Sequence, residues 1–113
     1  MYNFNFLRDE KLIQVFDDIW IKVNEQEKIT TIALTNKRLL FLDYDNNDYR
    51  ENLRISGKIN YVRYKEVYYF IELENIKNIV KSETYRIDLS NSKTIDFNNE
   101  DLFKLIEKII NKK

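Results

Sequence analysis

The sequence predicts a mainly β domain with one α-helix at its carboxy-terminal end. Short apolar runs with alternating polar residues, separated by tight polar corners, recur from Leu12 to Phe97, as in antiparallel strands. From Leu102 onward the apolar residues recur every three or four positions, which is the period of an amphipathic helix. We therefore expect about seven antiparallel strands followed by one helix.

The first predicted strand spans residues 12–23, where apolar and polar side chains alternate after Asp18. The adjacent pair Asp17-Asp18 interrupts its apolar pattern and predicts a β-bulge. A polar corner at residues 24–27 leads into a second strand at residues 29–35.

The next corner is the most informative part of the chain. Two apolar runs meet across Asn36-Lys37, the pattern of a tight β-hairpin, and predict a third strand over residues 38–44. The turn-prone polar residues at 43–48 are expected to end that strand. Residues 45–66 give no clear pattern, and an extra strand around Ile59 and Tyr61 stays open.

The remaining elements follow at short intervals. We expect strands over residues 67–73, 76–81, 85–90 and 94–97. In the helix that follows, Asn98 or Asn99 provides the amino-terminal cap, and the acidic first turn and basic last turn complement the helix dipole.

Two segments carry a resemblance to a known family. Residues 34–41 read LTNKRLLF, which is similar to the LTNKRLIF hairpin of bacterial pleckstrin-homology-like (PH-like) and GRAM-type domains. Residues 70–79 resemble the strand and I-x-x-I step of the same family. The resemblance covers about residues 9–112 of a single domain, 1–113. It implies a partly open barrel of two near-orthogonal sheets, capped by the helix and used for docking.

Composition limits the function. At 113 residues the chain is expected to form one domain. Its 19 basic and 19 acidic side chains cancel, whereas nucleic-acid binding usually shows a basic excess. The absence of Cys and His removes thiol nucleophiles, thiolate metal sites and the commonest general base. We expect no enzyme activity and no cofactor. With no secretory leader or long apolar stretch, a cytoplasmic location is expected.

One acidic cluster is a candidate metal site. Asp43, Asp45 and Asp48 alternate as in a Ca²⁺ loop, but the Gly and Glu that an EF-hand loop requires are missing. A solvated loop after a strand is the favoured interpretation.

Two sets of side chains are candidates for binding. The first is a partner surface of aromatic residues and one cation, if these side chains are exposed and not part of the core: Trp20, Tyr61, Arg63, Tyr64 and Tyr68. The second is a weaker set of contacts to an anionic ligand: Lys22, Lys28, Lys37 and Arg38. The acidic loop at residues 24–28 argues against phosphoinositide binding by the family's usual site.

The leading hypothesis is a non-enzymatic docking module. It binds a protein segment, or a second copy of the chain, through an exposed sheet edge or the barrel mouth. Binding to an anionic membrane surface is the alternative. Binding of single-stranded nucleic acid through the Tyr-rich run is the weakest of the three.

Overall fold

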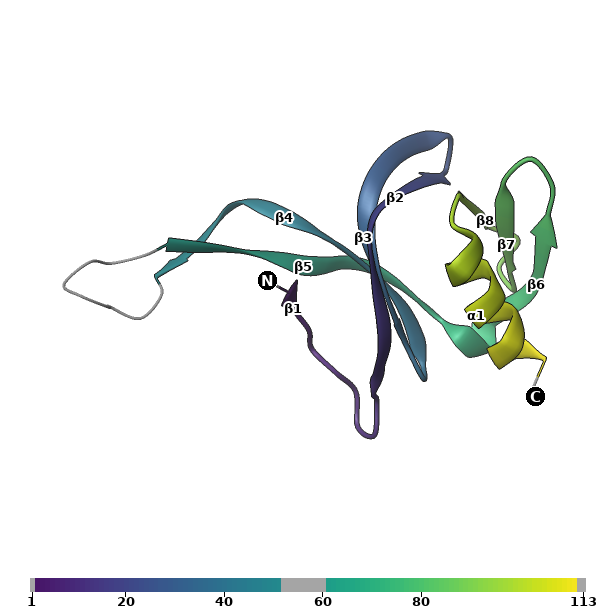
Figure 1. Ribbon diagram of the computed structural model, residues 1–113, viewed down its shortest axis with the longest axis horizontal. Helices are drawn as coiled ribbons and strands as arrows, with labels where there is room; N and C mark the ends of the chain where they lie inside the picture. Colours follow the sequence, from purple (N-terminus) through teal and green to yellow (C-terminus); the bar gives the residue numbers. More distant parts are fainter. Residues whose placement is uncertain (1, 52–60, 112–113) are drawn as a thin grey trace.

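A computed structural model describes residues 2–51 and 61–111, and of residues 45–51 and 61–64 only the backbone. Figure 1 shows strands crossing one another next to a single helix. In chain order the described elements are β1 (Tyr2–Asn3), β2 (Leu12–Val23), β3 (Gln26–Thr35), β4 (Arg38–Glu51), β5 (Tyr61–Glu72), the 3₁₀-helix η1 (Leu73–Asn75), β6 (Ile76–Lys81), β7 (Tyr85–Leu89), β8 (Thr94–Phe97) and α1 (Glu100–Ile110). The prediction of a mainly β fold with a carboxy-terminal helix is confirmed.

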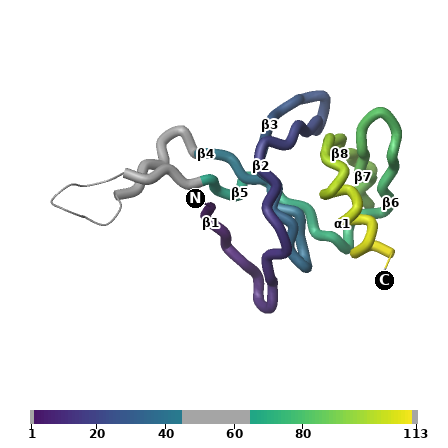
Figure 2. The backbone as a smooth tube through the Cα atoms, viewed as in Figure 1, coloured from purple at the N-terminus to yellow at the C-terminus, as the bar shows by residue number. Residues whose placement is uncertain are grey.

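The strands form one sheet in the order β1-β5-β4-β3-β2-β8-β7-β6, which is not closed. Seven strands in two near-orthogonal sheets are therefore not confirmed, because the described residues form eight strands in a single hydrogen-bonded sheet. The additional strand is β1. Within this sheet, the group β5-β4-β3-β2 is continuous with the group β8-β7-β6, because Ile21–Val23 of β2 pair with Ile95–Phe97 of β8. The path of the backbone through both groups can be followed in Figure 2.

Two tight corners of β3 lie where polar corners were predicted, although β3 begins at Gln26 and not at residue 29. Asn24 and Glu25 join β2 to β3 with φ angles of 52° and 66°, the left-handed values of a two-residue hairpin turn. At the other end, Asn36 and Lys37 join β3 to β4, and Leu34 pairs with Leu39 across the corner. Thr35 Oγ1 accepts hydrogen bonds from the amides of Lys37 and Arg38, which fixes this corner.

The predicted bulge lies at Asp17-Asp18. Phe16 pairs with Ile32 and Ile19 pairs with Thr30, so two residues of β2 lie opposite Thr31. Asp18 has a φ of 57°. The extra residue keeps both Phe16 and Ile19 on the buried side of β2, as a bulge re-aims a strand.

The hairpin of β4 and β5 is longer than expected. The polar residues at 43–48 do not end the third strand, because β4 continues to Glu51 and its last residues pair with the start of β5. β5 begins at Tyr61, where the sequence predicted a strand only from residue 67. Pairing with a neighbouring strand here outweighs the local preference for a turn.

The main core lies between α1 and one face of the sheet, which we call the inner face. Phe41, Ile32 and Phe97 are its largest fully buried strand residues, and Leu102 and Ile106 join them from the helix. Asn99 caps the helix, since its side chain accepts a hydrogen bond from the amide of Leu102 at 2.9 Å. The predicted cap and apolar helix face are confirmed. No helix in the described part of the chain is long and apolar enough to cross a membrane.

Candidate functional site

The opposite face of the sheet, the outer face, is covered in part by the amino-terminal arm, residues 2–11. Tyr2 and Asn3 run parallel to β5 and pair with Lys65 and Glu66. The chain then leaves the edge of β5, and Phe4 packs against a small outer cluster. The buried members of that cluster are Ala33, Leu40 and Leu42.

A buried ion pair fastens the arm to the hairpin of β3 and β4. Glu10 and Arg38 are joined by two charge-assisted hydrogen bonds, Nε to Oε2 at 2.8 Å and Nη2 to Oε1 at 2.6 Å. Thr35 Oγ1 donates to Glu10 Oε2 at 2.6 Å, and the amide of Leu7 donates to Oε1 at 2.9 Å. Nη2 of Arg38 also donates to the carbonyl oxygen of Asn5.

The electrostatics of this pair follow from its geometry. The hydrogen bonds from Arg38 lower the pKa of Glu10 to about 2, although burial of the carboxyl opposes the shift. The same contacts raise the pKa of Arg38. We call the pair the arm latch, since it holds residues 5–10 against the sheet.

A second group of polar contacts holds the start of the arm. The hydroxyl of Tyr2 donates to the carboxylate of Asp17 in the bulge at 2.8 Å, and Thr31 Oγ1 donates to the same group. Lys65 Nζ lies 3.4 Å from Asp17 Oδ1. The hydrogen bond from Tyr2 is the main reason that the pKa of Asp17 is lowered.

The departure of the arm leaves one edge of β5 open. β4 lines the other side of β5 up to Glu72, whereas β1 pairs only with Lys65 and Glu66. Among the described residues, Val67–Glu72 therefore have no strand partner on their outer side. The open stretch spans roughly 20 Å at about 3.3 Å per residue. We call it the open β5 edge.

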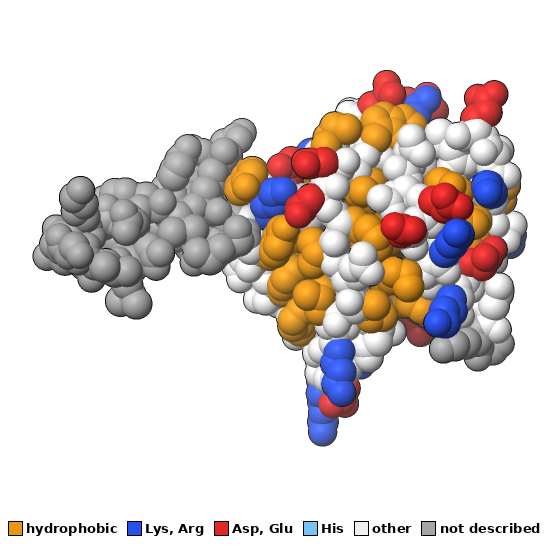
Figure 3. Space-filling model, viewed as in Figure 1, with side chains coloured by type: hydrophobic (Ala, Val, Ile, Leu, Met, Phe, Trp, Pro, Cys, Tyr) orange, Lys and Arg blue, Asp and Glu red, His pale blue; other side chains and the backbone are white. Residues whose placement is uncertain are grey.

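The open β5 edge carries an unusual side-chain pattern. No charged residue interrupts the run Val67-Tyr68-Tyr69-Phe70-Ile71. Tyr68 and Phe70 are each 46% exposed, while Tyr69 packs against the main core and Ile71 is buried in it. Figure 3 shows hydrophobic side chains gathered on the viewed face of the molecule beside the grey atoms. An uncharged aromatic edge of this kind favours pairing with another strand.

Hollows lie on both sides of this edge. One of about 480 Å³ lies between the arm and β5 and is lined by Asn5, Arg38, Val67, Tyr68, Tyr69 and Phe70. Another of about 470 Å³ lies between β5 and the connection from β7 to β8, and is lined by Tyr69, Phe70, Ile71, Glu72, Asn75, Leu89, Ser90 and Asn91. Side chains of an added strand point alternately to the two faces, so each hollow can receive every second one.

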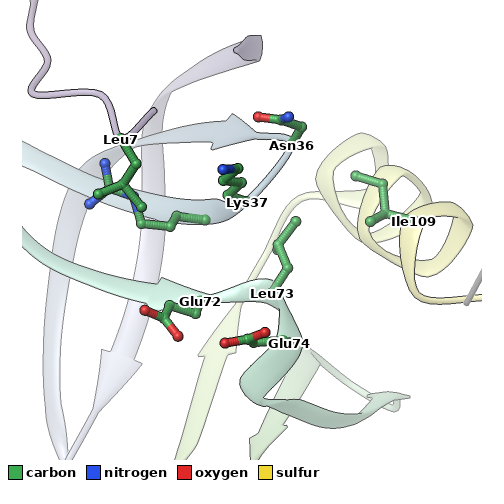
Figure 4. Close-up of a pocket in the computed structure, with 8 residues that line it drawn as sticks. Leu7, Asn36, Lys37, Glu72, Leu73, Glu74 and Ile109 are labelled. Atoms are coloured by element: carbon green, nitrogen blue, oxygen red, sulfur yellow. The ribbon is translucent and has the colours of Figure 1, made fainter. Parts of the chain in front are cut away.

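A further hollow of about 390 Å³ lies where β5 ends (Figure 4). Glu72 and Glu74 form one of its walls on either side of Leu73, Lys37 lies on the facing wall, and Ile109 comes from α1. The carboxylates of Glu72 and Glu74 form no ion pair within the described residues.

The predicted partner surface is only partly described. Tyr68 lies in the open β5 edge, and its hydroxyl donates to Thr30 Oγ1 at 3.0 Å. Trp20 is half-buried on β2, away from this edge, and its indole nitrogen donates to Glu27 Oε1. The side chains of Tyr61, Arg63 and Tyr64 lie outside the described residues, as do those of Asp45 and Asp48 in the acidic cluster.

Each of the four candidate cations has a partner within the chain. Lys22 lies 3.6 Å from Glu25, and Lys28 lies 2.7 Å from Asp43 and over the ring of Tyr68. Nζ of Lys37 donates to the carbonyl oxygen of Arg8 at 2.6 Å.

Arg38, the fourth cation, forms the arm latch. Its side chain is only 8% exposed, so a role as a contact for an external anion does not fit its position. The carboxylate that neutralises Arg38 belongs to Glu10 in the arm. The sequence contains no pattern that predicts a contact between these two residues.

Several residues of the candidate site carried only weak signals in the sequence. Phe70 and Glu72 lie in the strand predicted over residues 67–73, whereas Glu10 and Glu74 lie outside every predicted element. The uncharged run between Glu66 and Glu72 was visible, but its position at an open edge depends on the path of the arm.

Comparison with models of protein families, with curated proteins and with solved structures found no match.

Proposed function

We propose that the chain is a non-enzymatic docking module that binds an extended protein segment along the open β5 edge. The observation that carries this proposal is the unpaired stretch Val67–Glu72, which has a hollow on each face. A segment added there satisfies the free backbone groups of β5, and its side chains enter the two hollows.

The proposal includes a PH-like architecture. The strand order supports it, because β5-β4-β3-β2 and β8-β7-β6 form two consecutive groups joined through β2. The position of α1 against the core of both groups also supports it. The family resemblance implies such a two-part barrel with a terminal helix.

The same edge offers a route to self-association, in which a strand of a second copy covers it. We include a cytoplasmic location in the proposal, whether the edge binds a protein segment or a second copy.

Two other functions have less support. Membrane binding requires free cations, and Lys22, Lys28, Lys37 and Arg38 are already engaged with groups of the chain. If the chain co-sedimented strongly with anionic vesicles and salt weakened this binding, the result would favour membrane binding over protein docking. Binding of a single-stranded oligonucleotide that is lost in Tyr64→Ala and Tyr68→Ala variants would favour the nucleic-acid function.

Peptide selection combined with hydrogen exchange tests the docking proposal. A displayed library of random twelve-residue peptides is selected on the whole chain, and the enriched peptides are synthesised. Because outward amides of Val67–Glu72 lack a strand partner, we expect them to exchange rapidly in the free chain and slowly with peptide bound. Two methylated versions of each peptide are compared, one with the odd-numbered and one with the even-numbered backbone nitrogens methylated. Only one version should lose binding, because only alternate amides of the peptide face the β5 edge.

Two variants serve as controls. Phe70→Ala removes an exposed ring from the edge and should weaken binding, whereas Ile29→Ala removes a 56% exposed side chain from β3 and should not. Peptides that leave the exchange of β5 unchanged, or that bind equally after either methylation, would contradict the proposal. Light scattering distinguishes a bound peptide from a second copy of the chain, because binding of a second copy requires the molar mass of a dimer.

A further inference from the structure

We infer that the segment bound at the open β5 edge has apolar alternating side chains and carries Lys or Arg at the end that lies beside η1. This inference rests on the proposed docking function and specifies the chemistry of the partner.

The two ends of the edge differ in charge. At the end of the open stretch that borders β1, the Lys65 ammonium contacts Asp17 and the Asn3 side-chain amide donates to Glu66. At the far end, Glu72 and Glu74 border the hollow of Figure 4.

The cations near this second end are held by other groups. Arg38 donates two hydrogen bonds to Glu10, and Nζ of Lys37 donates one to the carbonyl oxygen of Arg8. Neither forms an ion pair with Glu72 or Glu74 among the described residues, although Arg38 is the cross-strand partner of Glu72 and, after the Glu10 hydrogen bonds, the Glu72 charge contributes to the raised pKa of Arg38. Two carboxylates beside the path of a bound segment therefore attract a basic side chain from that segment.

The middle of the edge selects for apolar side chains. Tyr68 and Phe70 line the hollow beside the arm, where Arg38 lies over the ring of Phe70 at 4.9 Å. Ile71 and Leu89 contribute to the hollow on the other side. The only charged side chain in the described lining of either hollow lies towards Glu72: Arg38, already paired with Glu10, in one hollow, and Glu72 itself in the other. A charged side chain placed elsewhere along the edge would lose water without an opposite charge beside it.

The shape of the edge favours a single segment over a second copy. β1 closes one end, and the turn into η1 closes the other. The β5 strand of a second copy runs from Tyr61 to Glu72 and carries β4 and β1 with it, so it extends beyond the open stretch. An isolated extended peptide has no such neighbours.

The experiment analyses the charge of the peptides selected above and their affinity for variants. We expect peptides that protect the β5 amides to concentrate Lys or Arg at one end. In the Glu72→Gln/Glu74→Gln double variant, their affinity should fall about tenfold, which corresponds to about 1.4 kcal/mol. The double variant Glu83→Gln/Glu107→Gln removes the same charge elsewhere and should bind as the wild type does.

The outcomes separate the two proposals. Peptides that protect β5 but are neutral or acidic, or whose affinity is unchanged by Glu72→Gln/Glu74→Gln, would overturn the inference and leave docking intact. The absence of any peptide that protects β5 would overturn docking itself. Salt dependence of wild-type binding gives a second measurement that needs no variant, and affinity that does not fall with added salt counts against the basic end.

Discussion

Replacing Glu10 by Gln should destabilise the fold through the arm latch. The Glu10 side chain has no exposed surface and accepts bonds from Arg38, Thr35 and the amide of Leu7. Gln keeps the shape but removes the charge, so the buried guanidinium of Arg38 loses its closest counter-charge. Breaking one partner of a buried ion pair typically costs about 3–5 kcal/mol.

The pKa of Glu10 gives an independent value for the stability that the arm latch contributes. It is held at about 2, against an ordinary value of 4.5. At 1.36 kcal/mol per unit, this difference corresponds to about 3 kcal/mol of stability. Because the folded pKa is the lower one, the stabilisation is complete above about pH 5 and is lost as the pH falls towards 2. The free energy with which the arm docks sets the upper limit of the loss, since the arm can detach without unfolding the sheet.

Urea unfolding measured from about pH 7 down to about pH 3 tests this reasoning. We expect wild type and Glu10→Gln to differ by up to about 3 kcal/mol at neutral pH, with a gap that closes as the pH falls. Asp9→Asn changes a neighbouring carboxylate that is 85% exposed, and it should follow the wild-type curve. A gap that is constant with pH, or below about 0.5 kcal/mol at neutral pH as for a surface pair, would refute the reasoning.

Three further changes give separate tests. Glu25→Gly should raise the free energy of unfolding by about 0.5–1 kcal/mol, because Glu25 has a φ of 66° and an Asn-Gly pair suits this turn; a loss of stability in urea would contradict that. Asn99→Ala should cost about 1 kcal/mol and lower the Tm by about 4–8 °C in calorimetry, through loss of the α1 cap, whereas an unchanged Tm would show that the cap is dispensable. Asp17→Asn should speed hydrogen exchange of the β1 amides, since the carboxylate accepts from Tyr2 and faces Lys65; equal exchange rates would rule out Asp17 as the anchor of β1.

The sequence predicted features that depend on local chemistry. The corner at Asn36-Lys37, the bulge at Asp17-Asp18 and the cap at Asn99 each arise from a few adjacent residues with strong conformational preferences. β8 and α1 were equally clear, because their apolar periods are regular.

Features that depend on distant contacts were missed. β1 is too short to show a period, and its place depends on Lys65 and Glu66. The burial of Arg38 depends on Glu10, which lies 28 positions earlier. The exposure of Tyr68 could be proposed from alternation, but the open edge beside it follows only from where the arm leaves β5.

The pairing of β2 with β8 has a consequence for the order of folding. β2, β3, β4 and β5 follow one another in the chain and each pairs with its neighbour, so this meander can form as soon as Glu72 has been synthesised. β8 reaches β2 only after nearly the whole chain is available, and the loop closed by this contact is long. We therefore expect a nascent chain to expose the unfinished inner face of the meander until β8 and α1 arrive to cover it.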